Sequence, residues 1–415
     1  MTLANKEITH LHNLAEQVRE ISCSDINIER KKAWLAHHNL QGYRPMLLIE
    51  AHELIPLLNV DERLKCTSPE GRALERQLLY KIWRFTEIKD DAVVEPSYKI
   101  PWSVHAGGYG VDFKEDRGQS EYGGSSHWDP VIIDFDKDVD KLHYRSLSVD
   151  YEASEQKFET ASKLLAGILD IKMRGSLWWT TGMTATLIKL VGMENFMMGM
   201  ITVPDGIHKL MNFLRDDQLN FIQQAEDLGV LTLNNEDDYV GSGTLGYVSD
   251  LPGREIAVEE RITPADMWVL SESQESVGVS PEMFEEFIFP YQLSIIERFG
   301  LTYYGCCEPL DNRWDIVKKI PNLRAVSVSP WCDQEYMADA LKRDYVFCRK
   351  PNPTMISTEV FNEDTIENDI RNTLTIAGSC NLEIVMKDIH TLHGENWRAA
   401  RWIEIARKAC RDFFA

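Results

Sequence analysis

The last third of the chain carries four short apolar runs that each end on polar or ionisable side chains. They read LTYYGC at 301–306, LRAVSVSP at 323–330, DYVFCRK at 344–350 and LEIVMKD at 382–388. Stretches with a helical pattern, such as DQEYMADALKR at 333–343, separate them. Apolar runs that alternate with helices predict parallel strands, because a parallel connection needs a crossover that is usually a helix.

The same alternation extends upstream. Four earlier runs complete a set of eight: YKIPWSVH at 98–105, LDIKMRG at 169–175, GVLTLN at 229–234 and DMWVLSES at 266–273. Eight such strands predict an α/β fold, a (β/α)8 TIM barrel over residues 91–415. A doubly wound sheet is the alternative, but no Gly-rich strand-to-helix turn of the dinucleotide-binding type is found.

Residues 1–90 have a mostly helical pattern. Leu11, Leu14 and Val18 recur at helical spacing, and residues 71–88 form a second amphipathic stretch. We therefore expect an N-terminal helical extension, 1–90, in front of the barrel.

Composition limits the class of partner and the compartment. The 415 residues carry a formal net charge of −22, and an acidic surface repels nucleic acid and anionic membranes. No apolar run approaches the roughly 20 residues that span a bilayer, and the N-terminus lacks the apolar core of a signal peptide. The eight cysteines are therefore expected as free thiols of a cytoplasmic protein. A homodimer is an arrangement that the sequence leaves open.

Polar side chains follow nearly every predicted strand. The carboxyl ends of barrel strands line the active site of TIM-barrel enzymes, so this pattern favours an enzyme. Polar residues also mark the point where any strand becomes a loop. The predicted strand-end residues are His105, Arg174, Asn234, Asn235, Glu236, Ser271, Glu272, Gln274, Cys306, Cys307, Glu308, Ser327, Ser329, Arg349, Lys350, Asn352, Lys387, Asp388 and His390.

Two adjacent thiols and a carboxylate stand out at 306–308. Together with His390, Cys306, Cys307 and Glu308 offer the mixed S, N and O ligands that suit Zn²⁺. Because strand residues alternate, Cys306 and Glu308 share one face and Cys307 takes the other. The alternative is that both cysteines are small core residues.

Ionisable groups at the other strand ends suggest further roles. Glu272 is a candidate catalytic acid or base, or a salt-bridge partner of Arg349 or Lys350. His105 is a candidate catalytic residue or a structural histidine. The candidate residues for binding an anionic cofactor or substrate group are Arg349, Lys350, Asn352 and Lys387.

Tryptophan and methionine gather between residues 176 and 200. Trp178, Trp179, Met183 and Met198 belong to this stretch. Such side chains line adaptable apolar pockets, but a stripe of this kind is more often helix core, which we favour here.

The order LTYYGCCEPLD, LRAVSVSPWCD, DYVFCRKPNPTMI and LEIVMKDIHTL resembles the uroporphyrinogen decarboxylase-like superfamily, and within it the corrinoid-dependent methyltransferases and O-demethylase methyltransferase components. The resemblance covers roughly residues 90–412. It implies a (β/α)8 barrel with an N-terminal helical extension, a separate corrinoid protein bound over the barrel mouth, and a zinc ion that activates a thiol or a methyl-bearing heteroatom.

The family's zinc motif does not carry over intact. Its His-x-Cys after the fifth strand falls on Gly305 and Cys307, or with a slip of one residue on Cys306 and Glu308. Its later cysteine falls near His390. The arginine-rich stretch of the true decarboxylases has no counterpart in this sequence.

The resemblance and the strand ends together predict a methyltransferase of anaerobic one-carbon metabolism. It would move a methyl group from an O-methyl substrate, such as a methoxyarene, or from an N-methyl substrate to the cob(I)amide of a corrinoid protein. Zinc, or Glu272 or Glu308 as an acid, would help the leaving atom depart. The alternatives are a cofactor-free decarboxylase or lyase that holds carboxylates with its strand-end cations, and a non-enzymatic ligand-binding or scaffold protein.

Overall fold

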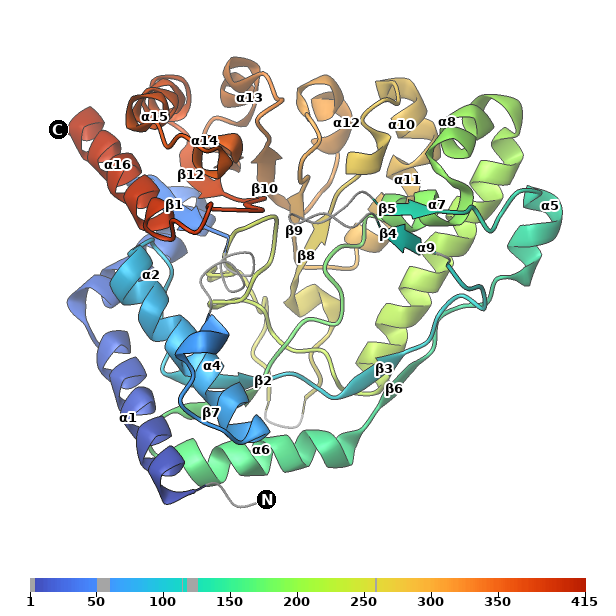
Figure 1. The fold of residues 1–415 in the computed structure, drawn as a ribbon. Coiled ribbons are helices and arrows are strands. Elements are labelled where there is room, and N and C mark those ends of the chain that lie inside the picture. The colour runs from blue at the N-terminus through green and yellow to red at the C-terminus, as the bar shows by residue number, and fades with distance from the viewer. Residues whose placement is uncertain (1–3, 51–59, 114, 118–125, 258–259) are drawn as a thin grey trace.

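A computed structural model describes residues 4–50, 60–113, 115–117, 126–257 and 260–415. Figure 1 shows helices arranged around the outside of a curved set of strands, with the chain coloured from its N-terminus to its C-terminus. All eight cysteines are free thiols.

A six-stranded parallel sheet in the order β1-β12-β11-β10-β9-β8 forms the centre of the fold. Its strands are β1 (Met46–Ile49), β8 (Trp268–Ser271), β9 (Leu301–Tyr304), β10 (Leu323–Val328), β11 (Val346–Arg349) and β12 (Asn381–Met386). The five strands β8 to β12 confirm five of the predicted apolar runs. The first strand of the chain lies beside the last, as it does in a TIM barrel.

Two more parallel strands, β2 (Ser97–Ile100) and β7 (Asp170–Met173), pair with each other apart from the sheet. The fold is therefore α/β and resembles a TIM barrel, but the strand ladders of the described residues do not close into a barrel. The predicted strand 229–234 is not a strand. Its side chains instead connect the end of β7 to β8. Thr232 Oγ1 accepts from Gly175 N at 3.1 Å, and Asn234 Oδ1 accepts from Trp268 N at 2.8 Å.

Strand β1 lies within the range predicted as a helical extension. Its register pairs Met46 with Glu383 and Ile49 with Met386 of β12. All four of its residues are buried, so MLLI has no polar alternation to mark it as a strand. The boundary at residue 90 stays a prediction, but residues 46–49 belong to the central sheet.

Helices cover the outer face of the sheet, and the longest are α9 and the two terminal helices α1 and α16 (Figure 1). The α-helices are α1 (Asn5–Ser22), α2 (Asp25–Ala36), α4 (Pro69–Trp83), α5 (Phe135–Asp138), α6 (Tyr151–Leu165), α7 (Thr184–Val191), α8 (Met193–Thr202), α9 (Pro204–Asp227), α10 (Pro281–Phe287), α11 (Phe289–Ile296), α12 (Trp314–Val317), α13 (Gln334–Leu341), α14 (Thr354–Ser357), α15 (Glu363–Ala377) and α16 (Trp397–Phe414). A π-helical turn, η1 (His37–Gln41), continues α2.

Two short antiparallel ladders branch from the connection between β2 and β7. β3 (Val104–Ala106) pairs with β6 (Leu147–Val149), and β4 (Glu115–Arg117) pairs with β5 (Ser126–Trp128). The predicted strand 98–105 is therefore split after Ile100. Pro101 follows at once, and a proline has no N–H to continue the ladder.

The concave side of the sheet is filled by a segment of the chain itself, residues 234–251, which we call the inserted loop. Its Val240, Leu245 and Tyr247 pack with the inward side chains Trp268 and Tyr303 in one buried cluster. In Figure 1 this yellow-green segment runs inside the curve of the strands. Three glycines make the close approach feasible. A Cβ would overlap the Tyr303 ring at Gly241, Val385 at Gly243 and the Asn234 carbonyl at Gly246.

Candidate active site

The carboxyl ends of β8, β9 and β12 bring a polar cluster together with the inserted loop. β8 leads into Glu272, β9 into the Cys306–Glu308 turn, and β12 into Lys387. The inserted loop adds Ser242. Side chains from four separate segments thus meet at one end of the sheet, where α/β proteins carry their sites.

Glu272 is fully buried and only partly satisfied. Its Oε2 accepts from Gln274 N at 3.0 Å, while Oε1 has no hydrogen-bond partner within the described structure. Burial, with Glu275 and Glu308 nearby, raises the pKa of Glu272 well above its usual range. This shift favours the protonated carboxylic acid, and one of its oxygens has no hydrogen bond within the described structure. Gly182 lies against it, where a Cβ would stand 2.6 Å from Oε1.

Glu308 connects the ends of β8 and β9. Its Oε1 accepts from Ser273 N at 2.8 Å and its Oε2 from Cys306 N at 2.9 Å. Burial raises the pKa of Glu308, although these backbone donors oppose the shift. Because both oxygens are engaged, Glu308 holds the turn in place. That turn passes through Gly305 at a φ of 96°, where a side chain would meet Leu310.

Cys306 lies within a set of donors and one cation. Its Sγ is 3.3 Å from Ser242 Oγ, 3.3 Å from Lys387 Nζ and 3.6 Å from Cys307 Sγ. The contact with Cys307 and the Lys387 ammonium lower the pKa of Cys306 to about 7, against the effect of burial. Cys307, whose Sγ also lies 3.5 Å from Asp388 Oδ2, has its pKa raised by the same contact with Cys306.

The four predicted zinc ligands are not gathered around one point. Both oxygens of Glu308 are bound by backbone amides, His390 is exposed, and an ammonium group sits against the Cys306 sulfur. A lysine cation at this distance stabilises a thiolate in place of a metal. The residues as arranged therefore do not fit a tetrahedral zinc ion.

The predicted anion-binding cations point in different directions, because successive side chains of a strand point to opposite faces of the sheet. Arg349 faces out of the sheet and pairs with Asp369 of α15 at 3.5 Å. Lys350 faces inward, 2.6 Å from Cys348 Sγ and over the Tyr303 ring. Within the described structure, neither Arg349 nor Lys350 forms the alternative salt bridge with Glu272.

Three other predicted residues lie outside the cluster. Asn352 caps a turn, and its Oδ1 accepts from Thr354 N at 3.0 Å. His105 lies exposed in β3 opposite Ser148, on an antiparallel ladder and not at the end of a sheet strand. His390 lies exposed after β12.

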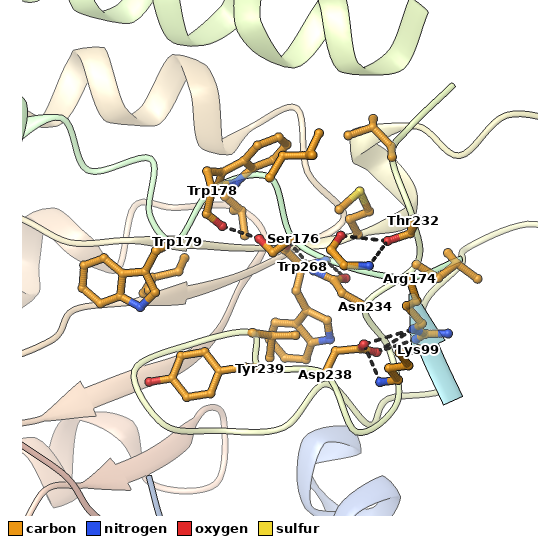
Figure 2. A pocket seen from close by; sticks show the side chains of 18 of the residues that line it. Lys99, Arg174, Ser176, Trp178, Trp179, Thr232, Asn234, Asp238, Tyr239 and Trp268 are labelled. Atoms are coloured by element: carbon orange, nitrogen blue, oxygen red, sulfur yellow. Dashed lines mark hydrogen bonds and ion pairs between the residues drawn. The ribbon is translucent and has the colours of Figure 1, made fainter. Parts of the chain in front are cut away.

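A cavity of about 610 Å³ opens between β7 and β8. Its lining reaches Leu270 and Gly241, which are sequence neighbours of the cluster, but includes neither Glu272 nor Cys306. Figure 2 shows Trp179 and Tyr239 at one end and the ionic group of Arg174, Lys99 and Asp238 at the other. Lys99 Nζ lies 2.7 Å from Asp238 Oδ1. The remaining lining is mostly apolar and includes Trp178, Leu231, Val240, Trp268 and Leu270.

The tryptophan and methionine stretch divides between core and cavity. Met183, Phe196 and Met200 are buried in the helical core, as expected. Trp178 and Trp179 lie in the connection before α7 and line the cavity. Trp178 also packs against the core, as expected, whereas Trp179 is exposed.

Sequence reasoning missed the inserted loop and its side chains. Ser242 contacts the Cys306 sulfur, and Tyr239 donates to Glu50 at the end of β1. The Gly241-Ser242-Gly243 triplet is the signal that could have found them, since closely spaced glycines mark the close approach of a backbone to other groups.

Comparisons with known proteins bear on the fold. No protein-family model matches the sequence, and no curated protein matches it. Among solved structures, a methyltransferase from Methanosarcina mazei is similar, with a TM-score of 0.51 and 12% sequence identity. The alignment covers 93% of this chain and 99% of that one. At this identity the likeness shows a shared fold. Among the described helices, none has both the length and the apolar content to cross a membrane.

Proposed function

We propose that the chain is a corrinoid-dependent methyltransferase of the uroporphyrinogen decarboxylase-like superfamily. It would move a methyl group from an O-methyl or N-methyl substrate to the cob(I)amide of a partner corrinoid protein. The fold that it shares with a methyltransferase along 93% of the chain supports this proposal. The site chemistry supports it further.

The observation that carries the proposal is the buried Glu272, whose Oε1 has no hydrogen-bond partner within the described structure and whose pKa is raised. When a methyl carbon leaves an ether oxygen, the bonding electron pair stays on oxygen, and an alkoxide or phenoxide is a poor leaving group without a proton. Glu272 donates that proton as the bond breaks. The cob(I)amide supplies the electron pair that receives the methyl carbon, so the charges balance.

The surroundings of Glu272 favour its protonated form. Glu275, Glu308 and the Cys306 sulfur all raise its pKa, after the larger effect of burial. Lys387 balances the charge on Cys306 nearby. We therefore assign Glu272 as the general acid and the Cys306–Lys387 pair as the group that sets the local charge.

The cavity suits a flat, methyl-bearing substrate. Its walls include Trp178, Trp179, Tyr239 and Trp268, and aromatic side chains stack on planar rings. Its volume of about 610 Å³ is in the range of small-molecule sites. We therefore favour a methoxyarene over a small methylamine.

Exposed apolar side chains occur on segments that follow the carboxyl ends of the strands, and we propose that they contribute to a surface that binds a corrinoid protein. They are Trp179, Val277, Trp331, Val360 and Trp397. Trp331 is 68% exposed and Val360 is 73% exposed. Large apolar groups left in water at the mouth of a site favour contact with another protein.

The decarboxylase alternative receives less support. It needs cations directed together at a carboxylate, but Arg349 points outward to Asp369 and Lys387 is engaged by Cys306 and Ser242. Metal analysis tests the predicted zinc at Cys306, Cys307, Glu308 and His390, which the arrangement of these side chains does not favour.

The test is the consumption of cob(I)amide. Purified protein, a corrinoid protein in its reduced form and a panel of methoxyarenes and methylamines are mixed without oxygen. We expect the cob(I)amide absorbance to fall with at least one methoxyarene, and to stay constant when this protein is left out. Release of carbon dioxide from a carboxylated substrate with no acceptor present would instead support the decarboxylase.

A further inference from the structure

A second cluster of potential ligands lies at the opposite end of the sheet. His37 and His38 belong to the η1 turn, and Glu383 lies in β12. None of the three side chains has any surface exposed to solvent. Glu383 pairs with Met46 at the beginning of β1, so the cluster lies toward the amino ends of the strands and away from Glu272.

The ligand atoms are spaced for one ion. His37 Nε2 lies 3.3 Å and His38 Nε2 lies 3.7 Å from Glu383 Oε2, and one ligand atom from each of the three residues lies within 4.8 Å of the others. Atoms about 2.0–2.1 Å from a tetrahedral zinc ion lie about 3.4 Å from one another. The spacing of the two imidazoles around the carboxylate is close to that value.

Several of these atoms have no hydrogen bond. Within the described structure, both ring nitrogens of His37 and Oε1 of Glu383 lack a hydrogen bond, although all are buried and His37 Nε2 is within ion-pair distance of Glu383 Oε2. Buried polar atoms are nearly always paired in folded proteins, because an unpaired one loses its water without replacement. A bound ion would satisfy the group.

The contacts around the cluster fix the ligands in a binding orientation. A carbonyl oxygen can only accept, so His38 Nδ1 donates to Tyr247 O at 2.9 Å and leaves its Nε2 lone pair toward Glu383. Thr244 Oγ1 donates to Glu383 Oε2 at 2.8 Å. Such outer contacts, with a backbone carbonyl on the second imidazole nitrogen, are typical of histidines that bind metals.

The charges also fit a cation. Among the described residues, the ion-pair contacts of Glu383 are with these two imidazoles. A neutral imidazole and an ionised carboxylate are the forms that bind metal.

We propose that His37, His38 and Glu383 bind one divalent transition-metal ion of the zinc class as a structural site. Two imidazoles and one carboxylate are a ligand set that Zn²⁺ accepts. The ion fastens the end of α2 to β12, and through Thr244 to the inserted loop. This site is independent of the proposed methyl transfer.

The test measures metal content and thermal stability in the full-length protein. Wild type prepared with zinc is expected to hold one ion per chain. Removal by a chelator should lower the melting temperature by several degrees, and Zn²⁺ but not Mg²⁺ should restore it. The variants His37→Gln and Glu383→Gln should lose the ion, whereas Cys306→Ala and Cys307→Ala should retain it.

Replacement of zinc by cobalt identifies the ligands in the wild-type protein. The proposal can therefore be tested even if a variant fails to fold. Co²⁺ bound to nitrogen and oxygen should give visible bands without the strong charge-transfer absorption of a thiolate ligand. The proposal is overturned if zinc-treated wild type holds no ion and melts at an unchanged temperature. It is equally overturned if the ion is lost in Cys306→Ala and retained in His37→Gln.

Discussion

Glu272 and Glu308 are both buried carboxylates at neighbouring strand ends, yet their surroundings give them different roles. Glu308 binds two backbone amides and holds a turn, whereas Glu272 leaves one oxygen without a partner. An acid that is to protonate a substrate needs both a raised pKa and a free oxygen. Of the two, Glu272 meets both conditions.

Replacing Glu272 by glutamine should lower the turnover rate by about 10²–10⁴-fold, because the amide cannot donate the proton. The raised pKa means that the acid is protonated below it and ionised above it, so the wild-type rate should fall as pH rises through that pKa. The pH–rate profile of wild type checks this. Glu275→Gln removes a neighbouring charge that raises the pKa, so it should move the fall to lower pH.

The exposed Glu335 provides the matched control, and Glu335→Gln should keep the wild-type profile. Glutamine resembles the neutral acid in shape, so the melting temperature of Glu272→Gln should not fall. A wild-type rate at Glu272→Gln would remove Glu272 from the mechanism.

The Cys306 thiol should titrate near pH 7 in wild type, and its pKa should rise when Cys307 is replaced by alanine. The contact with Cys307 is the largest influence on this thiol, so its loss favours the neutral form. Ultraviolet absorbance of the thiolate against pH measures the change. Cys380→Ala, at a buried thiol outside the cluster, should leave the titration as it is. An unchanged Cys306 titration in Cys307→Ala would contradict the assigned contact.

At the residue scale, the sequence predicted part of the cluster. Cys306, Glu308, Glu272 and Lys387 were expected at strand ends and do meet there. Arg349 is predicted at the same place but faces outward. The face of the sheet to which a strand residue points depends on the register of the strand, which the sequence alone does not determine.

At the element scale, the inserted loop determines the shape of the site. Gly241→Ala should lower the free energy of unfolding by about 1–3 kcal/mol, because the added Cβ would overlap the buried Tyr303 ring. Denaturant unfolding measures the change. Gly253→Ala is the control, since its Cβ would meet its nearest neighbour at 3.6 Å, an ordinary contact. Equal stability of the two variants would show that the loop does not pack against Tyr303.

Local sequence pattern fails to identify two elements, because tertiary contacts determine their structure. Residues 229–234 have the composition of a strand. Hydrogen bonds to the side chains of Thr232 and Asn234 take the place of backbone hydrogen bonds between strands. MLLI at 46–49 is uniformly apolar, so neither helical nor strand periodicity can identify it. Strands β8 to β12 can be predicted because each apolar run ends at polar residues.

At the scale of the whole molecule, the exposed apolar residues around the strand ends should act in partner binding. Trp331→Ala should raise the KM for the corrinoid protein, while the rate with free cob(I)alamin stays near that of wild type. Steady-state kinetics with the two acceptors separate these effects. Ile26→Ala removes an exposed apolar group on α2 and should change neither. An equal loss with both acceptors would place Trp331 outside a docking surface.

The most direct test of the account follows the methyl carbon itself. A methoxyarene with an isotope-labelled methyl group is mixed with stoichiometric protein and reduced corrinoid protein, using wild type and Glu272→Gln. We predict that wild type transfers the label to the cobamide and releases one phenol for each methyl group transferred, and that Glu272→Gln does so at least 100-fold more slowly. Label that stays on the substrate across the methoxyarene and methylamine panel, or that moves equally fast with Glu272→Gln, would contradict the account.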